Sequence, residues 1–340
     1  MREPELAATE LVEGIAKSSK IENMKITDKI KQANKTLFSF EILPPLKGEN
    51  IEHINRNIAN LLEFNPAFID VTYHQQEVEY RELPDGTVEK KTVRKRPGTV
   101  GISAAVQFKT GVDVVPHLIC GGFSKEDTEN ALIDLHFLGI DNILVVRGDP
   151  AATQRYFKPE PDGHKHALGL VKQVYNMNQG VYLDEELENS HPTDFCIGVA
   201  GYPEKHNEAP NRELDMKNLK DKVDAGADYI VTQMFYDNKK YFDFVDECRA
   251  MGINVPIIPG LKPISSKKQL TTLPHTFHID LPKELVNEVL KCESRDAVRQ
   301  LGVEWSIMQS KELIARGAPV IHFYTMGNSY NIAKIAKEVF

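Results

Sequence analysis

Short apolar runs rich in β-branched and aromatic residues recur along the chain, and stretches with helical periodicity separate most of them. The runs are mostly continuous rather than strictly alternating, which is typical of parallel strands buried on both faces. We therefore predict eight strands joined largely by helices. The predicted strands cover residues 37–43, 68–73, 113–119, 142–148, 195–202, 229–235, 255–261 and 320–325.

Helix start and stop signals support this alternation. Ser124 and Asp127 predict a capping box at the start of one helix, and Gly139 predicts its end. Eight strand–helix units favour a (β/α)8 TIM barrel. A doubly wound open sheet is the competing architecture, but the chain contains neither GxGxxG nor GxxxxGK[ST], so that route to dinucleotide binding has no support.

A barrel typically takes about 250 residues, and this chain has 340. We expect an N-terminal helical extension over residues 1–33 and a single barrel domain over residues 34–340. The surplus is further assigned to two insertions, at about residues 75–99 and 175–193. The sequence Pro84-Asp85-Gly86, between β-branched arms, predicts a β-hairpin within the first insertion.

Composition narrows the class of protein. The net charge of −8 argues against a nucleic-acid partner. The chain has no apolar run long enough to span a membrane, and its acidic N-terminus does not resemble a signal peptide, so we expect no membrane association and a cytoplasmic location. Four cysteines without a CxxC motif suggest neither a disulfide framework nor a zinc site. His164 and His166 lie in a loop without a clear ligand partner, and we expect no metal.

Polar residues gather at the ends of the predicted strands, where barrels of this kind place their active sites. Glu41 is flanked by apolar residues in FSFEILPP, and desolvation there would raise its pKa into the range of a general acid. A buried ion pair with a lysine or arginine is the alternative. The other strand-end residues are Thr72, His117, Arg147, Asp149, Tyr202, Gln233 and Tyr324.

Several sequence strings, taken in order, resemble the methylenetetrahydrofolate reductase family from about residue 37 to the end of the chain. The most specific are FEILPP, RGDP, YPEKH and DAGADYIVTQ, supported by FIDVTY, PHLIC, IIPGLKPI and HFYTMG. This resemblance implies a TIM barrel that binds FAD without a Rossmann motif. It also implies that NADH or NADPH reduces the flavin, which then reduces 5,10-methylenetetrahydrofolate to 5-methyltetrahydrofolate in a ping-pong mechanism with two hydride transfers.

The same resemblance assigns roles to residues of this chain. It implies that Glu41 is the catalytic acid and that Asp149 is a catalytic residue near the flavin and the substrate. Gln233 and Gln269, together with Glu41 and Asp149, would bind the folate. The FAD-binding positions it implies are Thr72, Tyr73, His117, Arg147, Gly148, Asp149, His166, Ala167, Tyr202, His206, Ala209, Asp215, Asn218 and Lys222.

The chain departs from the family pattern at three positions, where His166, Asp221 and Asn328 replace residues common in relatives. These departures leave open a non-catalytic flavin- or folate-binding paralogue. A flavin-free barrel methyltransferase or lyase is a third hypothesis, which the FAD-matching positions disfavour. The resemblance also implies a homo-oligomer, a dimer or tetramer, and we expect the chain to lack the C-terminal regulatory domain of larger relatives.

Overall fold

A single parallel sheet forms the centre of the molecule. The computed structural model describes residues 23–150, 154 and 156–340. Its nine-stranded sheet has the order β10-β11-β1-β2-β5-β6-β7-β8-β9, and every neighbouring pair is parallel. The strands are β1 (Leu37–Ile42), β2 (Phe68–Val71), β5 (Val114–Ile119), β6 (Asn142–Val146), β7 (Cys196–Gly201), β8 (Tyr229–Thr232), β9 (Ile257–Ile258), β10 (Gly260–Leu261) and β11 (Val320–Tyr324).

The strands β9 and β10 lie at the two ends of this order, and only Pro259 separates them along the chain. They are two halves of the predicted seventh strand, so the sheet closes on itself as a barrel. Proline lacks the backbone N–H that a continuous ladder requires, which accounts for the interruption. The predicted (β/α)8 fold is confirmed, and each of the eight predicted strands is present.

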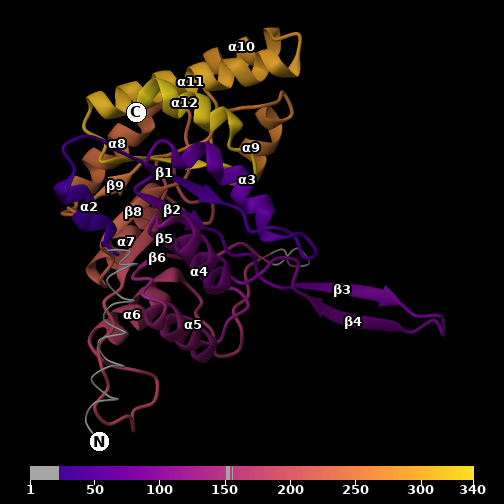
Figure 1. Cartoon of the computed structure of the whole chain (residues 1–340), viewed down its shortest axis with the longest axis vertical. Coiled ribbons are helices and arrows are strands. Elements are labelled where there is room, and N and C mark those ends of the chain that lie inside the picture. Colours follow the sequence, from indigo (N-terminus) through magenta and orange to yellow (C-terminus); the bar gives the residue numbers. More distant parts are fainter. Residues whose placement is uncertain (1–22, 151–153, 155) are drawn as a thin grey trace, which may run out of the picture.

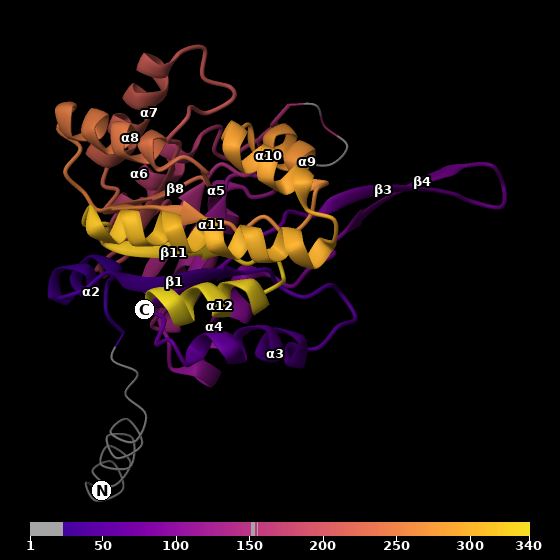
Figure 2. The same cartoon turned by 90° about the horizontal axis from the view of Figure 1, so that it is seen from above.

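Helices surround the barrel on its outside (Figures 1 and 2). Ser124 and Asp127 form the predicted capping box at the start of α5, and Gly139, with a φ of 66°, follows its end. The helices are α2 (Ile26–Gln32), α3 (Ile51–Leu62), α4 (Thr99–Thr110), α5 (Lys125–Phe137), α6 (Ala167–Asn178), α7 (Arg212–Asp224), α8 (Asn238–Ala250), α9 (Gln269–Phe277), α10 (Lys283–Lys291), α11 (Arg295–Ala315) and α12 (Tyr330–Val339). Within the described ranges, none of these helices has the length and apolarity needed to cross a membrane.

Successive side chains of β1 point to opposite faces of the sheet, and each face has its own apolar core. Phe38 and Phe40 belong to the large apolar cluster between the strands and the outer helices. Ser39 and Glu41 point the other way, into the barrel, because successive strand residues face opposite sides of a sheet. The barrel interior below them is filled by a separate apolar cluster. That cluster contains Ile26, Phe68, Val115, Leu144, Cys196, Tyr229, Val231, Ile258 and Val320.

The helix α2 closes the N-terminal end of the barrel. Ile26 is fully buried, and its backbone N–H donates to Asn142 Oδ1 at 2.9 Å. Lys29 Nζ lies 2.6 Å from Asp113 Oδ2, just before β5. This helix accounts for the last part of the predicted N-terminal extension, and residues 1–22 of that extension lie outside the described residues.

The first predicted insertion contains the hairpin that Pro84-Asp85-Gly86 indicated. The strands β3 (Glu77–Glu82) and β4 (Val88–Val93) pair antiparallel. Gly86 adopts a φ of 80° in the turn between them, a conformation that glycine favours. The hairpin projects well away from the barrel (Figure 1).

Two other segments differ from the expected organisation. The helix α6 extends to Asn178, so the first residues of the predicted second insertion are helical and the irregular loop begins after them. After β10, the chain forms two helices, α9 and α10, that were not predicted as an extra segment. Leu285 and Val289 of α10 are buried in an apolar cluster with Val298 of α11, which explains why these short helices are stable there.

Candidate active site

Five polar side chains meet inside the C-terminal end of the barrel. Glu41 of β1 is in register with Asp70 of β2 on one side and Tyr324 of β11 on the other. Asp70 Oδ2 lies 3.2 Å from His117 Nε2 of β5, and Lys262 follows β10. Because residues in register on parallel strands point to the same face, these groups converge where the barrel opens.

Glu41 is the group in this cluster with the perturbation expected of an acid. Burial raises its pKa to about 7, Asp70 adds to the rise, and the positive charges of His117 and Lys262 oppose it. Its backbone carbonyl accepts a 2.7 Å hydrogen bond from the Thr325 hydroxyl, which ties β1 to the end of β11. At neutral pH, a carboxyl group with this pKa is protonated in a substantial fraction of the molecules.

Asp70 lies at the centre of a buried polar chain next to Glu41. Burial alone would lower the pKa of His117, but the hydrogen bond to Asp70 and the charges of Asp70 and Glu41 raise it overall. His322 lies on the other side of Asp70, with Nε2 3.9 Å from Oδ2. Its Nδ1 is 2.9 Å from Ser39 Oγ, and burial lowers its pKa. One carboxylate thus faces two imidazoles, of which His117 carries the hydrogen bond.

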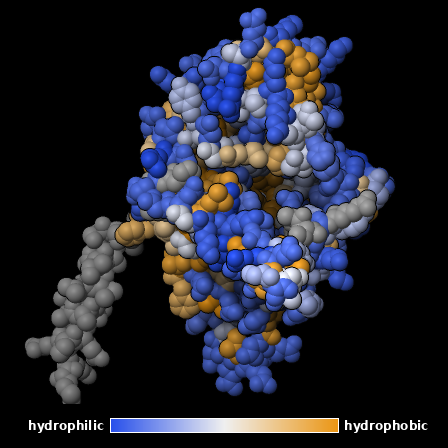
Figure 3. All heavy atoms as spheres, turned by 90° about the vertical axis from the view of Figure 1, so that its right-hand side faces the viewer, coloured by the Kyte–Doolittle hydropathy of each residue, from blue (hydrophilic) through white to orange (hydrophobic). Residues whose placement is uncertain are grey.

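A cavity of about 350 Å³ opens at the same end of the barrel, where β6 and β7 end. Figure 3 views the molecule from the side on which the hairpin projects, and apolar atoms lie in hollows near the middle of a mostly hydrophilic face. The cavity is lined by strand ends, by the start of α6 and by one face of α7. Among its lining residues are Arg147, His166, Ala167, Tyr202, His206, Ala209, Asp215, Asn218 and Lys222.

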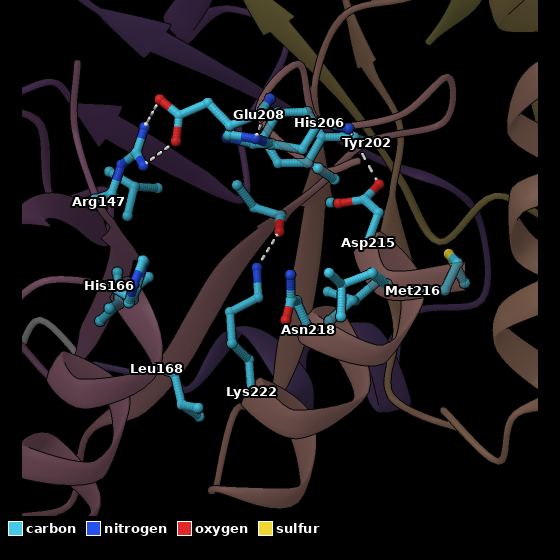
Figure 4. A pocket seen from close by; sticks show the side chains of 18 of the residues that line it. Arg147, His166, Leu168, Tyr202, His206, Glu208, Asp215, Met216, Asn218 and Lys222 are labelled. Carbon is cyan, nitrogen blue, oxygen red and sulfur yellow. Dashed lines mark hydrogen bonds and ion pairs between the residues drawn. The ribbon is translucent and has the colours of Figure 1, made fainter. Parts of the chain in front are cut away.

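Arg147, directly after β6, is one of the residues that line this cavity. Its guanidinium makes a two-pronged ion pair with Glu208 and lies over the Phe157 ring, with Cζ 4.9 Å from the ring centroid (Figure 4). Glu208 raises the pKa of Arg147 and is itself held at a lowered pKa by the same contact. The Nε atom of Arg147 is buried without a hydrogen-bond partner in the described part of the chain. An anionic ligand could satisfy that donor.

One face of helix α7 forms a wall of the cavity and carries polar residues. Asp215, Asn218 and Lys222 follow one another at spacings of three and four, so they share one face of the helix (Figure 4). Lys222 Nζ donates to the Ala200 carbonyl at 2.7 Å, and burial lowers its pKa to about 8 against the attraction of Asp215. Asp215 accepts from the His206 backbone N–H at 3.1 Å, which fixes the loop after β7.

The start of α6 faces the same cavity. His166 is the N-cap of this helix and makes no side-chain capping hydrogen bond, whereas Asn211 caps α7 by accepting from the Leu214 N–H. The Gly169 N–H donates to the His166 carbonyl at 3.0 Å. Within the described part of the chain, the N–H groups of Ala167 and Leu168, two residues that line the cavity, have no partner. An uncapped helix N-terminus next to Arg147 is a favourable place for phosphate oxygens.

Comparisons with known proteins identify relatives of this chain. A model of the family described as methylenetetrahydrofolate reductase matches residues 25–339. The chain belongs to the methylenetetrahydrofolate reductase family. Methylenetetrahydrofolate reductase 1 of Schizosaccharomyces pombe is 34% identical over 93% of this chain and 48% of its own length. The 5,10-methylenetetrahydrofolate reductase of Pectobacterium carotovorum is 30% identical over 86% of each chain. The chain thus spans about half the length of the Schizosaccharomyces pombe protein and most of the length of the Pectobacterium carotovorum protein.

A solved structure supports the fold of this reductase-family chain. A Clostridium thermocellum protein, described as binding two copies of 5-methyl-5,6,7,8-tetrahydrofolic acid, superposes with a TM-score of 0.51 over 92% of this chain and 97% of its own. Its sequence identity to this chain is 16%. At that level the likeness concerns the barrel alone.

The remaining residues predicted from the family lie outside the cavity lining, around the barrel opening. Thr72 donates to the Ile42 carbonyl, Tyr73 packs on Phe123, and Gly148 has a φ of 82° in the turn before Asp149. The Asp149 carbonyl accepts from the Gln75 amide at 2.9 Å. Asp149 therefore lies in the loop that follows β6.

The two glutamines predicted to bind folate occupy different loops of this family member. The side-chain oxygen of Gln233, Oε1, accepts from the Met234 backbone N–H at 2.9 Å. The side-chain oxygen of Gln269, Oε1, accepts from the Ser265 backbone N–H at 2.6 Å. Both amide groups are thereby left oriented as donors. Gln233 borders a small cavity with Lys205 and His278, and Gln269 starts α9.

Two of the three departures from the family pattern, Asp221 and Asn328, have local partners. Asp221 pairs with Lys217 at 2.7 Å, and the Asn328 side chain accepts from the Tyr330 N–H at 3.1 Å. His164, the other histidine of the HxH pair, lies 2.6 Å from the Gln173 side chain. Among the described residues, no group of three or more His, Cys, Asp or Glu side chains is placed to hold a metal ion.

Three ionisable groups near the site were not predicted from the sequence. Asp70 and Lys262 are 1% and 7% exposed, although carboxylates and amines are seldom buried without a partner. Glu204 is partly buried, and burial raises its pKa to about 7. The period-two alternation within FIDVTY could have placed Asp70 inside the barrel, but no pattern indicated which residues it would meet.

Proposed function

We propose that the chain is a flavin-dependent reductase that converts 5,10-methylenetetrahydrofolate to 5-methyltetrahydrofolate. NADH or NADPH would reduce bound FAD and leave, and the folate would then take its place, giving ping-pong kinetics. The observation that carries the proposal is that Glu41, with its pKa of about 7, and the polar cavity both lie at the C-terminal ends of the barrel strands. Family membership supports the reaction class.

The cavity residues fit a dinucleotide cofactor with a diphosphate. Arg147 offers a buried, unpartnered Nε, and Lys222 offers two further ammonium protons beyond its bond to Ala200. The uncapped start of α6 adds backbone N–H donors for phosphate oxygens. When bound, FAD supplies the hydride acceptor and donor that no protein side chain provides. Binding would require Glu208 to share or release Arg147.

In this proposal Glu41 holds and delivers the proton. The protonated carboxyl gives its proton to the ring nitrogen of the substrate that departs when the five-membered ring opens, and solvent then restores it. Asp149 provides a negative charge that favours the resulting cation. Gln233 and Gln269 orient the folate through their free amide donors. Beyond the buried Ser39 and His322 pair, the barrel interior is apolar, which restricts water to the opening of the site.

An anaerobic flavin titration tests this function. The purified protein should show a flavin absorbance spectrum or acquire it on addition of FAD. NADH or NADPH should bleach the spectrum, and 5,10-methylenetetrahydrofolate should restore it. A colourless protein that rebinds no flavin would overturn the proposal. Flavin that is reduced but not reoxidised by the folate would instead indicate the non-catalytic binding paralogue.

The names of the relatives give different nicotinamide donors. The Arabidopsis thaliana protein is named for NADH and the Caenorhabditis elegans protein for NADPH. The titration with each nucleotide therefore also assigns the donor. We propose in addition that the chain forms a homodimer or homotetramer, as the family resemblance implies. Light scattering on the purified protein measures that state directly.

A further inference from the structure

Strand register places Lys262 beside Glu41. Gly260 of β10 pairs with His322 of β11, and the Glu41 residue of β1 pairs with Tyr324. Two residues beyond Gly260, Lys262 is therefore level with Tyr324 and Glu41. His322 points into the barrel toward Ser39, so Gly260 and Lys262 face the interior as well.

The surroundings of Lys262 make its charge unusual. The residue is 7% exposed, and within the described part of the chain its ammonium group makes no hydrogen bond or ion pair shorter than 4 Å. A buried ammonium that makes no direct hydrogen bond or ion pair is costly. Burial lowers the pKa of Lys262 to about 8, and the carboxylate that opposes this effect is Glu41.

The other ionisable groups facing Glu41 are already engaged. Asp70 of β2 is hydrogen-bonded by His117 of β5 at 3.2 Å. The Tyr324 hydroxyl of β11 donates to the Thr232 carbonyl at 2.6 Å, and burial raises its pKa well above the ordinary value. His322 is adjacent to Ser39, and burial favours its neutral form. Lys262 is thus the cation in this cluster whose charge is not taken up by a direct hydrogen bond.

We propose that Lys262 is a positioning residue whose ammonium group acts through Glu41 to set the pH range over which the site reduces its folate substrate. The inference rests on the proposed function. When Glu41 passes its proton to the departing nitrogen, a carboxylate forms in a buried place. The Lys262 charge stabilises that carboxylate, keeps its own proton, and makes Glu41 a stronger acid. Without Lys262, Glu41 holds its proton to higher pH and releases it less readily.

The test separates the two half-reactions across pH 6 to 9 by anaerobic stopped-flow. In wild type, the rate of flavin reoxidation by 5,10-methylenetetrahydrofolate should fall as pH rises. In Lys262→Met, the midpoint of that fall should move up by about one pH unit and the rate at low pH should drop. The pH dependence of flavin reduction by NADH or NADPH should not change. Lys262→Arg, which keeps the charge, should return the midpoint toward wild type.

The matched control is Lys29→Met, which removes a lysine paired with Asp113 at the opposite end of the barrel. It should leave the midpoint unchanged whatever its effect on stability. A Lys262→Met midpoint equal to that of wild type, or moved to lower pH, would overturn the inference. A shift in Lys262→Arg as large as that in Lys262→Met would do the same, because it would reflect altered packing rather than lost charge.

A substrate-free measurement distinguishes failure of this inference from failure of the proposed function. The infrared band of a protonated carboxyl that is lost in Glu41→Gln reports the titration of Glu41 directly. Its midpoint should also move up in Lys262→Met, or in Lys262→Gln if the methionine variant folds poorly. If the folate never reoxidises the flavin, the proposed function fails, and the infrared midpoint still confirms or refutes the pairing of Lys262 with Glu41.

Discussion

At the scale of single residues, the site depends on the placement of a few ionisable groups in an apolar barrel. Glu41 lies within β1 beside buried aromatic residues, so its carboxyl loses hydration. The positive charges of His117 and Lys262 only partly offset the resulting rise in its pKa, and Asp70 adds to it. Its immediate sequence neighbours already predicted this perturbation. The partners Asp70 and Lys262 come from other strands, and their proximity depends on how the barrel closes.

Replacing Glu41 with Gln should separate the two half-reactions. The amide keeps the size of the side chain but has no acidic proton, so flavin reduction by NADH or NADPH should stay near the wild-type rate. Reduction of the folate should slow by about 100-fold or more, the usual contribution of a general acid. Stopped-flow absorbance of the flavin measures both rates, and folate reduction at the wild-type rate would rule out the acid role.

The same substitution should change how stability depends on pH. Because folding raises the pKa of Glu41 from 4.5 to about 7, the folded chain binds more protons than the unfolded chain between these values. The free energy of unfolding contributed by Glu41 therefore falls as pH rises through this window. Relative to Glu41→Gln, wild type should lose about 2 kcal/mol between pH 5 and 8.

Urea denaturation at each pH measures this difference. The exposed Glu186→Gln in the loop before β7 is the control for the loss of one carboxylate, and it should show no comparable trend. A Glu41→Gln variant whose stability follows that of wild type at every pH would show that Glu41 does not titrate in this range.

At the scale of elements, packing after β10 determines where the loop with Lys262 and Gln269 lies. Helix α11 crosses this loop so closely that a Cβ added to Gly302 would lie 1.9 Å from the Ile264 carbonyl oxygen. Glycine is therefore required there for the close approach rather than for its backbone freedom. The short helices α9 and α10 that complete this region escaped prediction because their stability comes from tertiary burial more than from local pattern.

Two glycine-to-alanine substitutions in helices should have opposite effects. Gly302→Ala forces α11 away from Ile264 and should destabilise the chain by about 2 to 3 kcal/mol. Gly101→Ala in α4, where an added Cβ meets nothing within 4 Å, should stabilise it by about 0.5 to 1 kcal/mol. Chemical denaturation measures both changes. Equal effects of the two substitutions would contradict the packing argument.

At the scale of the whole molecule, the sequence allowed more of the architecture than of the site to be predicted. The eight strands are visible as apolar runs because a closed parallel sheet buries both faces, and the hairpin is marked by its turn residues. The contacts inside the barrel opening join strands from opposite ends of the chain, such as β1 and β11. Local periodicity specifies which face a residue takes, but not which residue it meets there.

The whole barrel should respond to the cofactor through the cavity between β6, β7 and α7. A ligand that binds only the folded chain stabilises it by about 2.7 kcal/mol at 100 times its dissociation constant. For a chain of this size, FAD should therefore raise the midpoint of thermal unfolding by about 4 °C. Lys222→Met should abolish most of that rise, because it removes a buried ammonium group that lines the cavity.

Lys217→Met on the same helix provides the comparison. Lys217 is exposed and pairs with Asp221 at 2.7 Å, an interaction that contributes little to stability at the surface. Its replacement should leave the FAD-dependent rise intact, so any general effect of losing a lysine from α7 is accounted for. Calorimetry with and without FAD measures both variants. An equal FAD-dependent rise in Lys222→Met and Lys217→Met would place the cofactor away from this face of α7.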